Sequence, residues 1–326
     1  MFSVDQYAAA HSVAVVIEEP WRGTIAVTGG DRRSFLHALL TNDITALKQG
    51  SGAYAAYLTP QGRMISDMRV VEIGDRLLLG VEAGFAAPLA DRLDKLIFSE
   101  DVQVKDISGE IGEVSVHGPK AADIIAQATG VMVEALADQY SNLTRESRPA
   151  AGLLTVVRDD ALGLLGFDVY AARRDMPSLR EKLLEAGATT AGRDTVETLR
   201  IEAARPRFGI DMTTDTIPLE AGIEDRAISF TKGCYVGQEV IIRVMHRGHG
   251  RVARRLVRLV LPGSPLPPRG EKIFSGDRQV GEITSAAESP VAGAAMAMGY
   301  VHRDHAAPGT ELVVNGSKAR VHQAGD

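Results

Sequence analysis

The order of the expected secondary-structure elements is the feature that most restricts what this chain can fold into. Three strand-like runs follow one another at 52–58, 64–73 and 76–81, and the next segment, 86–98, spaces its apolar residues as a helix does. A strand meander followed by a helix is typical of an α+β fold and not of alternating parallel βαβ units. We therefore predict α+β architecture with antiparallel sheets.

The same plan occurs a second time in the middle of the chain. A strand at 112–117 leads into a helix, and the runs 153–158 and 163–171 form a paired hairpin. An amphipathic helix at 177–186 follows this hairpin. These elements predict a second α+β subdomain at roughly 110–190, inside a larger region at 1–250.

The last part of the chain has a different pattern, because a turn-rich segment at 262–270 lies among short strands. The expected strands are 252–261, 272–274, 279–284, 294–301, 311–314 and 318–322. Many short strands with Gly and Pro between them are typical of a small β-barrel or a sandwich. We place a domain boundary near residue 250 and predict a C-terminal β-barrel domain at 251–326.

Composition excludes several classes of protein. The chain has 326 residues, of which 45% are apolar and 24% charged, as in ordinary globular proteins. Its single cysteine rules out a disulfide within the chain and suits a reducing compartment. No apolar run reaches the roughly 20 residues of a membrane span, and residues 1–20 lack the Lys or Arg of a signal peptide. We expect a cytoplasmic protein with no membrane partner.

The segment 230–258 contains the only cysteine, Cys234, and then becomes basic. Between Glu239 and Glu271 there is no acidic residue, although the whole chain has a net charge of −6. The arginines in this interval are Arg243, Arg247, Arg251, Arg254, Arg255, Arg258 and Arg269. Two interpretations stay open, namely a solvated face and a site for a polyglutamate tail, tRNA phosphate or acidic partner. The scarcity of aromatic residues here disfavours recognition of RNA bases by stacking.

Cys234 itself allows two interpretations. A lone cysteine is commonly a small buried hydrophobe, but a glycine neighbour, Lys232 and the basic continuation favour an exposed, nucleophilic thiol. One cysteine cannot hold an iron–sulfur cluster alone. His246 and His249 lack thiols or carboxylates near them in sequence, so we predict no metal site.

Three stretches resemble known families. The octapeptide Lys232-Gly-Cys-Tyr-Val-Gly-Gln-Glu239 resembles the hallmark of the YgfZ family, folate-binding factors in iron–sulfur protein maturation. The segments 198–211 and 217–222 resemble the glycine-cleavage T-protein (aminomethyltransferase), and 59–71 is similar to the T-protein hairpin that approaches the folate pteridine. This resemblance, which spans nearly the whole chain, implies a three-domain ring with a tetrahydrofolate species bound on one side.

The resemblance also implies folate contacts at Tyr57, Asp67 and Asp168. T-proteins carry two consecutive Asp residues on the hairpin, and the first of them, essential for aminomethyl transfer, aligns with Ser66. A serine cannot supply the negative charge that stabilises a cationic intermediate, and Asp67 is expected to point to the opposite side of the strand. Aminomethyl transfer is therefore only an alternative at this stage.

The function that the resemblance implies is that of a tetrahydrofolate-binding accessory protein. It would assist assembly or repair of iron–sulfur clusters in client enzymes, including those that modify tRNA. Cys234, Lys232 and Gln238 would form its active face, while Arg243 and Arg247 would contact an anionic tail or partner. The alternatives are a folate-dependent aminomethyltransferase or demethylase, and a tRNA-interacting module that uses the arginine-rich segment.

Overall fold

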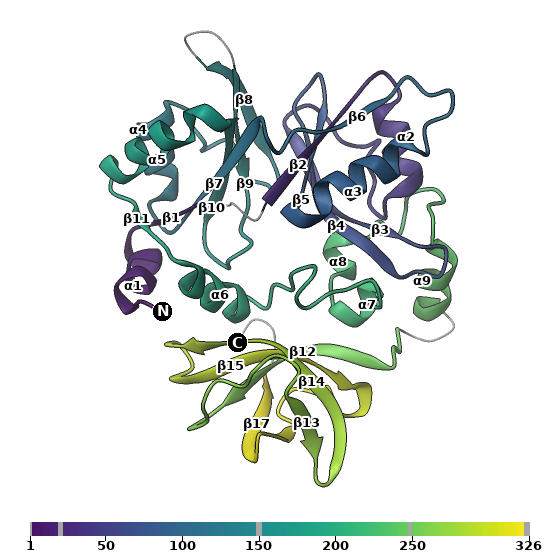
Figure 1. The fold of residues 1–326 in the computed structure, drawn as a ribbon, viewed down its shortest axis with the longest axis vertical. Coiled ribbons are helices and arrows are strands. Elements are labelled where there is room, and N and C mark those ends of the chain that lie inside the picture. Colours follow the sequence, from purple (N-terminus) through teal and green to yellow (C-terminus); the bar gives the residue numbers. More distant parts are fainter. Residues whose placement is uncertain (1, 19–21, 148–151, 247–249, 323–326) are drawn as a thin grey trace.

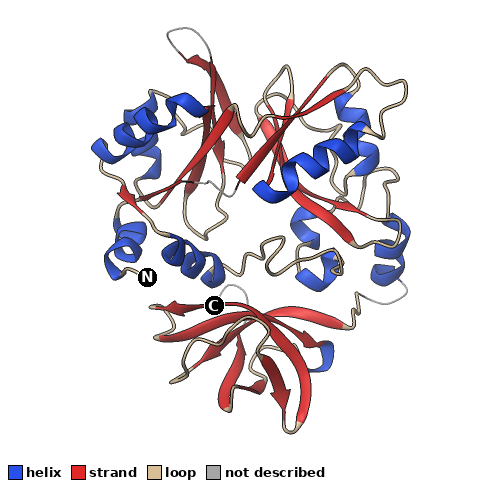
Figure 2. Cartoon of the chain, in the orientation of Figure 1, coloured by secondary structure: helices blue, strands red, loops and turns tan. Residues whose placement is uncertain are grey.

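The computed structural model describes residues 2–18, 22–147, 152–246 and 250–322. The described residues form three parts in a triangular arrangement (Figure 1). Two parts are sheets covered by helices, and the third is a barrel of strands (Figure 2). Both termini of the described chain lie near the junction between the second sheet and the barrel (Figure 1).

The first part is a five-stranded antiparallel sheet in the order β3-β4-β5-β2-β6. Its strands are β2 (Arg22–Thr28), β3 (Ser51–Leu58), β4 (Met64–Glu72), β5 (Leu77–Glu82) and β6 (Gln103–Asp106). Helices α2 (Arg32–Leu39) and α3 (Ala83–Asp94) pack on one face, where Leu36, Leu79 and Leu93 are fully buried. The predicted meander and the helix after it are confirmed.

The second part is a six-stranded sheet in the order β11-β1-β7-β10-β9-β8. Its strands are β1 (Val15–Glu18), β7 (Ile111–His117), β8 (Asn142–Ser147), β9 (Gly152–Arg158), β10 (Gly166–Ala172) and β11 (Thr189–Thr190). Helices α4 (Ala121–Thr129) and α5 (Met176–Glu185) cover it, the latter preceded by a 3-10 turn, η1 (Arg173–Asp175). The hairpin of β9 and β10 is confirmed.

One element joins the second sheet from far away in the sequence. Helix α1 (Val4–Ser12) leads into β1, which pairs antiparallel with β7 and parallel with β11. The second part is thus not confined to 110–190, because residues near the N-terminus supply one of its inner strands. Burial drives this pairing, since Val15 and Ile17 are completely buried.

Four helices connect the second sheet to the barrel. They are α6 (Arg193–Glu202), α7 (Pro218–Ala221), α8 (Glu224–Ala227) and α9 (Gln238–His246). Ile241 of α9 packs with Leu58 and Met64 of the β3–β4 hairpin, so α9 lies against the first sheet. The sequence did not predict α9, because it lies within the basic segment.

The C-terminal part is a closed barrel in the order β12-β15-β14-β13-β16-β17, which decides between the barrel and the sandwich. Its strands are β12 (Arg254–Leu261), β13 (Lys272–Ser275), β14 (Arg278–Ser289), β15 (Ala294–His302), β16 (Glu311–Val314) and β17 (Ser317–His322), with a 3-10 turn η2 (Arg303–His305). Leu259, Ile273 and Val301 fill its core. In the described part of the chain, no helix is both long and apolar enough to cross a membrane.

Candidate functional site

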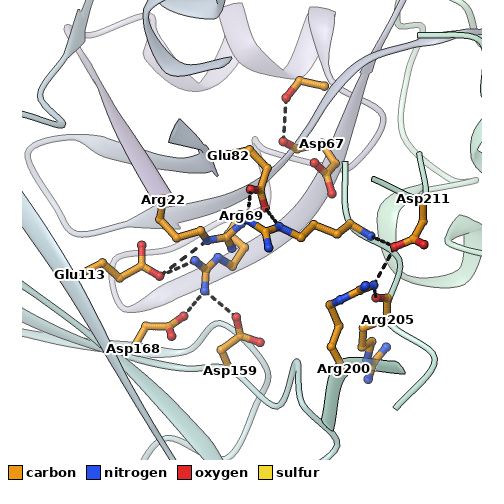
Figure 3. A network of polar contacts seen from close by, with 12 residues as sticks. Arg22, Asp67, Arg69, Glu82, Glu113, Asp159, Asp168, Arg200, Arg205 and Asp211 are labelled. Carbon is orange, nitrogen blue, oxygen red and sulfur yellow. Dashed lines mark hydrogen bonds and ion pairs between the residues drawn. The ribbon is translucent and has the colours of Figure 1, made fainter. Parts of the chain in front are cut away.

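A polar cavity of about 140 Å³ lies where the first sheet, the second sheet and the segments around α6 and α8 meet. Its polar lining includes Arg22, Tyr54, Asp67, Arg69, Glu82, Ser115, His117, Asp159, Asp168, Glu197, Arg200, Arg205, Arg207 and Arg226. Every described residue that lines the cavity precedes residue 227, so the barrel contributes none of them. Figure 3 shows how its charged groups converge.

Asp67 faces this cavity because of the register of the β3–β4 hairpin. Successive side chains of a strand point to opposite faces, and Asp67 pairs with Ala56 while Arg69 pairs with Tyr54. The Tyr54 hydroxyl donates a hydrogen bond of 2.6 Å to Asp67 Oδ2. Burial raises the pKa of Asp67, although this hydrogen bond opposes the rise.

Ser66 has the opposite orientation. It pairs with Tyr57 on the other face of the hairpin and is 2% exposed. It lines a separate hollow of about 490 Å³ beside α3, together with Arg92 and Lys95. The carboxylate of the Ser66-Asp67 pair therefore belongs to the central cavity, and the serine does not.

Tyr57 was predicted as a folate contact, but the structure places it away from the cavity. It is 4% exposed within the core between the first sheet and its helices, and the guanidinium of Arg92 lies 5.7 Å from its ring centre. The tyrosine on the cavity face is Tyr54, three residues earlier, because an odd spacing reverses the direction of a strand side chain.

Asp168 lines the cavity, where it belongs to a buried cluster around Arg69 (Figure 3). The Arg69 guanidinium donates hydrogen bonds to Asp168, to Glu113 and, over 2.6 Å, to Asp159. Ser115 donates to the other oxygen of Asp168 over 2.6 Å. The cluster joins β4 of the first sheet to β7 and β10 of the second.

Three carboxylates around one guanidinium cannot all be ionised at low cost. Burial raises the pKa of Asp168 against the pull of Arg69, and the charges of Asp159 and Glu113 raise it further. Burial also favours the neutral form of Asp159, but Arg69 and His117 outweigh it and lower the pKa of Asp159. Asp168 is therefore the carboxyl group in this cluster that most readily holds a proton.

A second set of ion pairs ties the first sheet to the segment after α6. Arg207 pairs with Glu82 of β5 over 2.7 Å, and Arg22 of β2 pairs with the same carboxylate over 3.4 Å. Arg200 of α6 pairs with Asp211 over 2.7 Å. These contacts hold the cavity walls in place across three segments that are distant in sequence.

Several buried polar atoms at the cavity find no hydrogen-bond partner among the described residues. They are Nε of Arg69, Nδ1 of His117 and Nε of Arg205. Unpaired buried polar atoms are uncommon in folded proteins and call for a ligand or water that satisfies them. Burial lowers the pKa of His117 to about 4, so this imidazole is neutral at pH 7 and presents one donor and one acceptor.

The octapeptide lies elsewhere. Cys234 is exposed, Gln238 begins α9, and Arg243 is exposed on the same helix. None of these residues, nor Lys232, lines the central cavity. Arg247, predicted to contact an anion, lies outside the described residues. The structure therefore separates the predicted catalytic residues from Asp67 and Asp168.

Lys232 is buried and has a structural environment. Its ammonium group donates hydrogen bonds to the carbonyl oxygens of His37 (2.5 Å) in the last turn of α2 and of Leu40 (2.6 Å) and Asn42 (3.1 Å) just after it. It also lies 5.1 Å from the ring centre of Tyr235. Burial lowers the pKa of Lys232 to about 8, while the three carbonyl groups stabilise its charged form.

Gly237 brings the octapeptide into contact with the β3–β4 hairpin. Its φ is +84°, and a Cβ there would lie 2.5 Å from the carbonyl oxygen of Thr59. On the other side of the contact, a Cβ at Gly62 would lie 2.9 Å from the Val240 side chain. Two of the three stretches that carry the family resemblance are therefore packed against each other.

The arginine-rich segment does not form one continuous strip. Arg254 pairs with Glu220 over 3.1 Å and lies 4.5 Å from the ring centre of Tyr300. Arg258 is 6% exposed and donates a hydrogen bond to the carbonyl of Glu202. These two arginines attach the barrel to the connecting helices, while Arg243 lies on α9.

Sequence reasoning missed the cavity residues Tyr54, Arg69, His117, Arg205 and Arg226. Two of them had a signal in the sequence. Arg69 follows Asp67 by two positions on a strand and therefore shares its face, and Arg205 lies within the segment 198–211 that resembles the T-protein. The positions of Tyr54, His117 and Arg226 at the cavity depend on pairings between distant segments. In the part of the chain that the structure describes, no three His, Cys, Asp or Glu side chains are grouped to hold a metal ion.

The two helix-covered sheets, the barrel and the cavity between the sheets define a class of protein. Residues 3–232 match the family described as GCVT N-terminal domain, and residues 254–324 match the glycine cleavage T-protein C-terminal barrel domain. The chain belongs to the glycine cleavage T-protein family. Membership of the YgfZ branch stays a prediction.

Curated relatives and a solved structure agree with this assignment. The chain is 29% identical over 315 residues to an aminomethyltransferase of Streptomyces coelicolor, covering 95% of this chain and 84% of the relative. It is 27% identical over 320 residues to that of Bacillus subtilis, with 95% and 85% covered. The glycine cleavage system aminomethyltransferase T of Bartonella henselae has the same fold, with a TM-score of 0.88 at 23% identity over 98% of this chain and 88% of that one. The predicted T-protein-like fold is confirmed.

Proposed function

We propose that the protein binds a tetrahydrofolate in the central cavity and transfers a one-carbon unit, as an aminomethyltransferase. The observation that carries this proposal is the orientation of the Ser66-Asp67 pair. Asp67 faces the cavity and Ser66 lies on the other face of the strand, so the serine removes no negative charge from the cavity. The curated relatives named aminomethyltransferase support the proposal.

The residues present fit a pterin ring. A pterin carries amino and ring N–H donors together with ring acceptors, and the cavity offers carboxyl groups at Asp67 and Asp168 beside the unpaired nitrogens of His117 and Arg69. Its volume of about 140 Å³ is below the roughly 300–1,000 Å³ of sites for whole drug-sized ligands. The cavity would enclose one end of a folate and leave the rest outside.

The chain's own groups have distinct roles in this proposal. Bound tetrahydrofolate would supply the nitrogen atoms that accept the one-carbon unit. Asp67 provides a fixed negative charge beside the position where positive charge develops, and Tyr54 holds that carboxylate in place. Asp168 holds a proton or donates it to the pterin ring, and Arg69 orients the Asp168 carboxyl group. Such preorganised groups need no rearrangement during the reaction.

Two measurements test the proposal. Tetrahydrofolate is titrated into the wild-type protein and the Asp168→Asn variant by calorimetry, and we expect saturable binding that the substitution weakens. Radiolabelled methylenetetrahydrofolate is then incubated with ammonia and dihydrolipoamide, and label is expected in the aminomethyl thioether. In this reaction the two bonds between the methylene carbon and the folate nitrogens break, and the carbon forms one bond to the dihydrolipoamide sulfur and one to the ammonia nitrogen. The thiol and ammonia each lose a proton, and the two folate nitrogens take these protons up. Binding without any transfer would contradict the catalytic part of the proposal.

A second candidate function is the accessory role in iron–sulfur protein assembly or repair. It is supported by the exposure of Cys234 within the octapeptide and by the contact of Gly237 with the hairpin turn. Clients would include iron–sulfur enzymes that modify tRNA, and the cysteine would act with a partner. The test is a Cys234→Ala variant in cells, where activity of these enzymes should fall while folate binding persists. Unchanged enzyme activities would exclude a role of the thiol.

A further inference from the structure

Two arginines that line the cavity form no ion pair with the described residues. Of the arginines that line it, Arg69 and Arg200 are paired with buried carboxylates, and Arg22 and Arg207 share Glu82. Arg205 and Arg226 line the same cavity, but neither forms an ion pair with any carboxylate of the described residues. Neither guanidinium group is therefore in direct contact with a carboxylate of the described residues, although the charges of Asp159 and Asp160 act on Arg205 from a greater distance.

The two guanidinium groups are close enough to influence each other. Burial, together with the charge of Arg226, lowers the pKa of Arg205. Nε of Arg205 is buried without a hydrogen-bond partner among the described residues. Two like charges at a partly buried site are unfavourable unless an anion binds between them, and guanidinium groups bind carboxylates in a two-pronged geometry.

Arg226 is connected to the proposed catalytic carboxylate through Tyr54. Its guanidinium carbon lies 5.2 Å from the ring centre of Tyr54, and the hydroxyl of this tyrosine is bonded to Asp67. The cationic guanidinium of Arg226 and the anionic carboxylate of Asp67 thus both contact the side chain of Tyr54. A ligand with a carboxylate and an ammonium group on neighbouring atoms matches this pattern.

We propose that Arg205 and Arg226 bind the carboxylate of a small α-amino acid, whose ammonium group faces Asp67. This proposal rests on the proposed function, and the amino acid would be a second ligand beside the folate. The carboxylates of a folate do not suit the position, because the aminobenzoyl group separates them from the pterin. A folate whose pterin contacts Asp168 would direct its glutamate out of a cavity of this size.

The test uses calorimetric titration of the full-length protein with alanine and with propionate, which has the same carbon skeleton but no ammonium group. We expect the wild-type protein to bind alanine more tightly than propionate. Arg205→Gln and Arg226→Gln should each weaken alanine binding by at least about tenfold, the size expected for loss of a charged hydrogen bond. Asp67→Asn should remove the preference for alanine over propionate. Arg76→Gln is the matched control, because Arg76 is paired with Asp75 and neither residue lines the cavity, so this variant should bind alanine as the wild type does.

The outcomes separate this proposal from the proposed function. Alanine binding that is absent, or that survives both arginine substitutions, overturns the subsite even if tetrahydrofolate binds. The arginine variants could also bind tetrahydrofolate more weakly and yet bind tetrahydropteroate, which lacks the glutamate, as the wild type does. That result would assign the two arginines to the folate and would also overturn the amino-acid subsite. If tetrahydrofolate does not bind to the wild type, the proposed function fails while the alanine titration still decides the subsite. Arg226→Lys, which keeps the charge but loses the two-pronged geometry, replaces Arg226→Gln if that variant does not fold.

Discussion

The hydroxyl of Tyr54 donates a hydrogen bond of 2.6 Å to the carboxylate of Asp67 across strands β3 and β4. The register of the hairpin places both side chains on the cavity face, and a register shift after Tyr57 precedes the turn. The tyrosine hydroxyl stabilises a negative charge that burial opposes. A carboxylate held in this way is suited to stabilise developing positive charge in a substrate.

The first prediction concerns this carboxylate. Asp67→Asn should lower the rate of one-carbon transfer by about 10²- to 10⁴-fold, the range for loss of a positioned acid–base or electrostatic group. The amide keeps the shape and the hydrogen bond to Tyr54 but has no charge. Single-turnover transfer of radiolabelled carbon measures the rate.

Ser66→Ala is the matched control, since Ser66 is adjacent in sequence and faces a different hollow. Its transfer rate should stay within about twofold of wild type, because the Ser66 side chain does not line the central cavity. A larger loss with Ser66→Ala than with Asp67→Asn would reverse the assignment of the essential residue.

The second prediction is a pH dependence that arises from His117. The pKa of His117 is about 4 in the folded protein, against 6.5 for an ordinary histidine. Between these values the unfolded chain binds a proton that the folded protein does not, so the free energy of unfolding rises with pH over this window. The rise in the free energy of unfolding that His117 causes is complete above pH 6.5, and it amounts to at most about 3 kcal/mol.

Urea unfolding of the wild type and His117→Gln from pH 4 to 8 measures this contribution. The variant should show a flatter dependence between pH 4 and 6.5, and the two curves should run parallel above pH 7. Equal slopes over the acidic window would mean that another group is responsible.

The third prediction separates structure from chemistry within the octapeptide. Lys232→Met should lower the free energy of unfolding by about 2–4 kcal/mol, because three carbonyl oxygens at the C-terminal end of α2 and just after it lose a charged donor. Lys232→Arg should not restore it, since a planar guanidinium cannot direct three donors to one point as an ammonium does. Urea denaturation measures both variants.

Cys234→Ala is the comparison for this experiment. The thiol is exposed, so stability should change by less than about 0.5 kcal/mol. Any loss of function in this variant would then reflect the thiol itself. A destabilisation equal to that of Lys232→Met would show that Cys234 is also structural.

The fourth prediction concerns the contact between the octapeptide and the hairpin. Gly237→Ala places a methyl group 2.5 Å from the Thr59 carbonyl oxygen at a φ of +84°. The strained backbone and the clash together should cost about 2–4 kcal/mol in unfolding free energy. The melting temperature should fall, and folate binding should weaken because the hairpin turn shifts.

Gly233→Ala tests the same substitution four residues earlier. Apart from Gly233 and its two chain neighbours, no described residue has an atom within 4 Å of a Cβ placed at this position. Its stability should match that of the wild type to within about 0.5 kcal/mol. Equal effects of the two substitutions would refute the role assigned to Gly237.

Much of the local structure could be predicted from the sequence. The strands around Tyr54 and Asp67 are recognisable from the alternation of their side chains and from the turn with Pro60 and Gly62 between them. The barrel strands are recognisable from the Gly and Pro residues that separate them. These signals are local, because a strand or turn is recognisable from a few neighbouring residues. Helix α9 was missed because Arg243 and its neighbours were interpreted by charge and not by period.

The cavity could be predicted only in part. Asp67 and Asp168 were identified through the family resemblance, and both line it. Tyr57 was chosen in place of Tyr54 because register, which decides the face, depends on the partner strand. Arg205 lies in the segment 198–211 that resembles the T-protein, but Arg226 lies in none of the resembling stretches, and the two come together only when the segments after α6 and at α8 meet.

The sequence by itself determined the α+β class, the C-terminal barrel strands, the family resemblance and the importance of the stretch around Cys234. Only the tertiary structure decided that β1 joins the second sheet, that Lys232 is a buried structural donor and that Asp67 rather than Ser66 faces the cavity. The physical reason is that the first set follows from periodicity and turn chemistry within short segments. The second set follows from hydrogen bonds, burial and ion pairing between residues that are far apart along the chain.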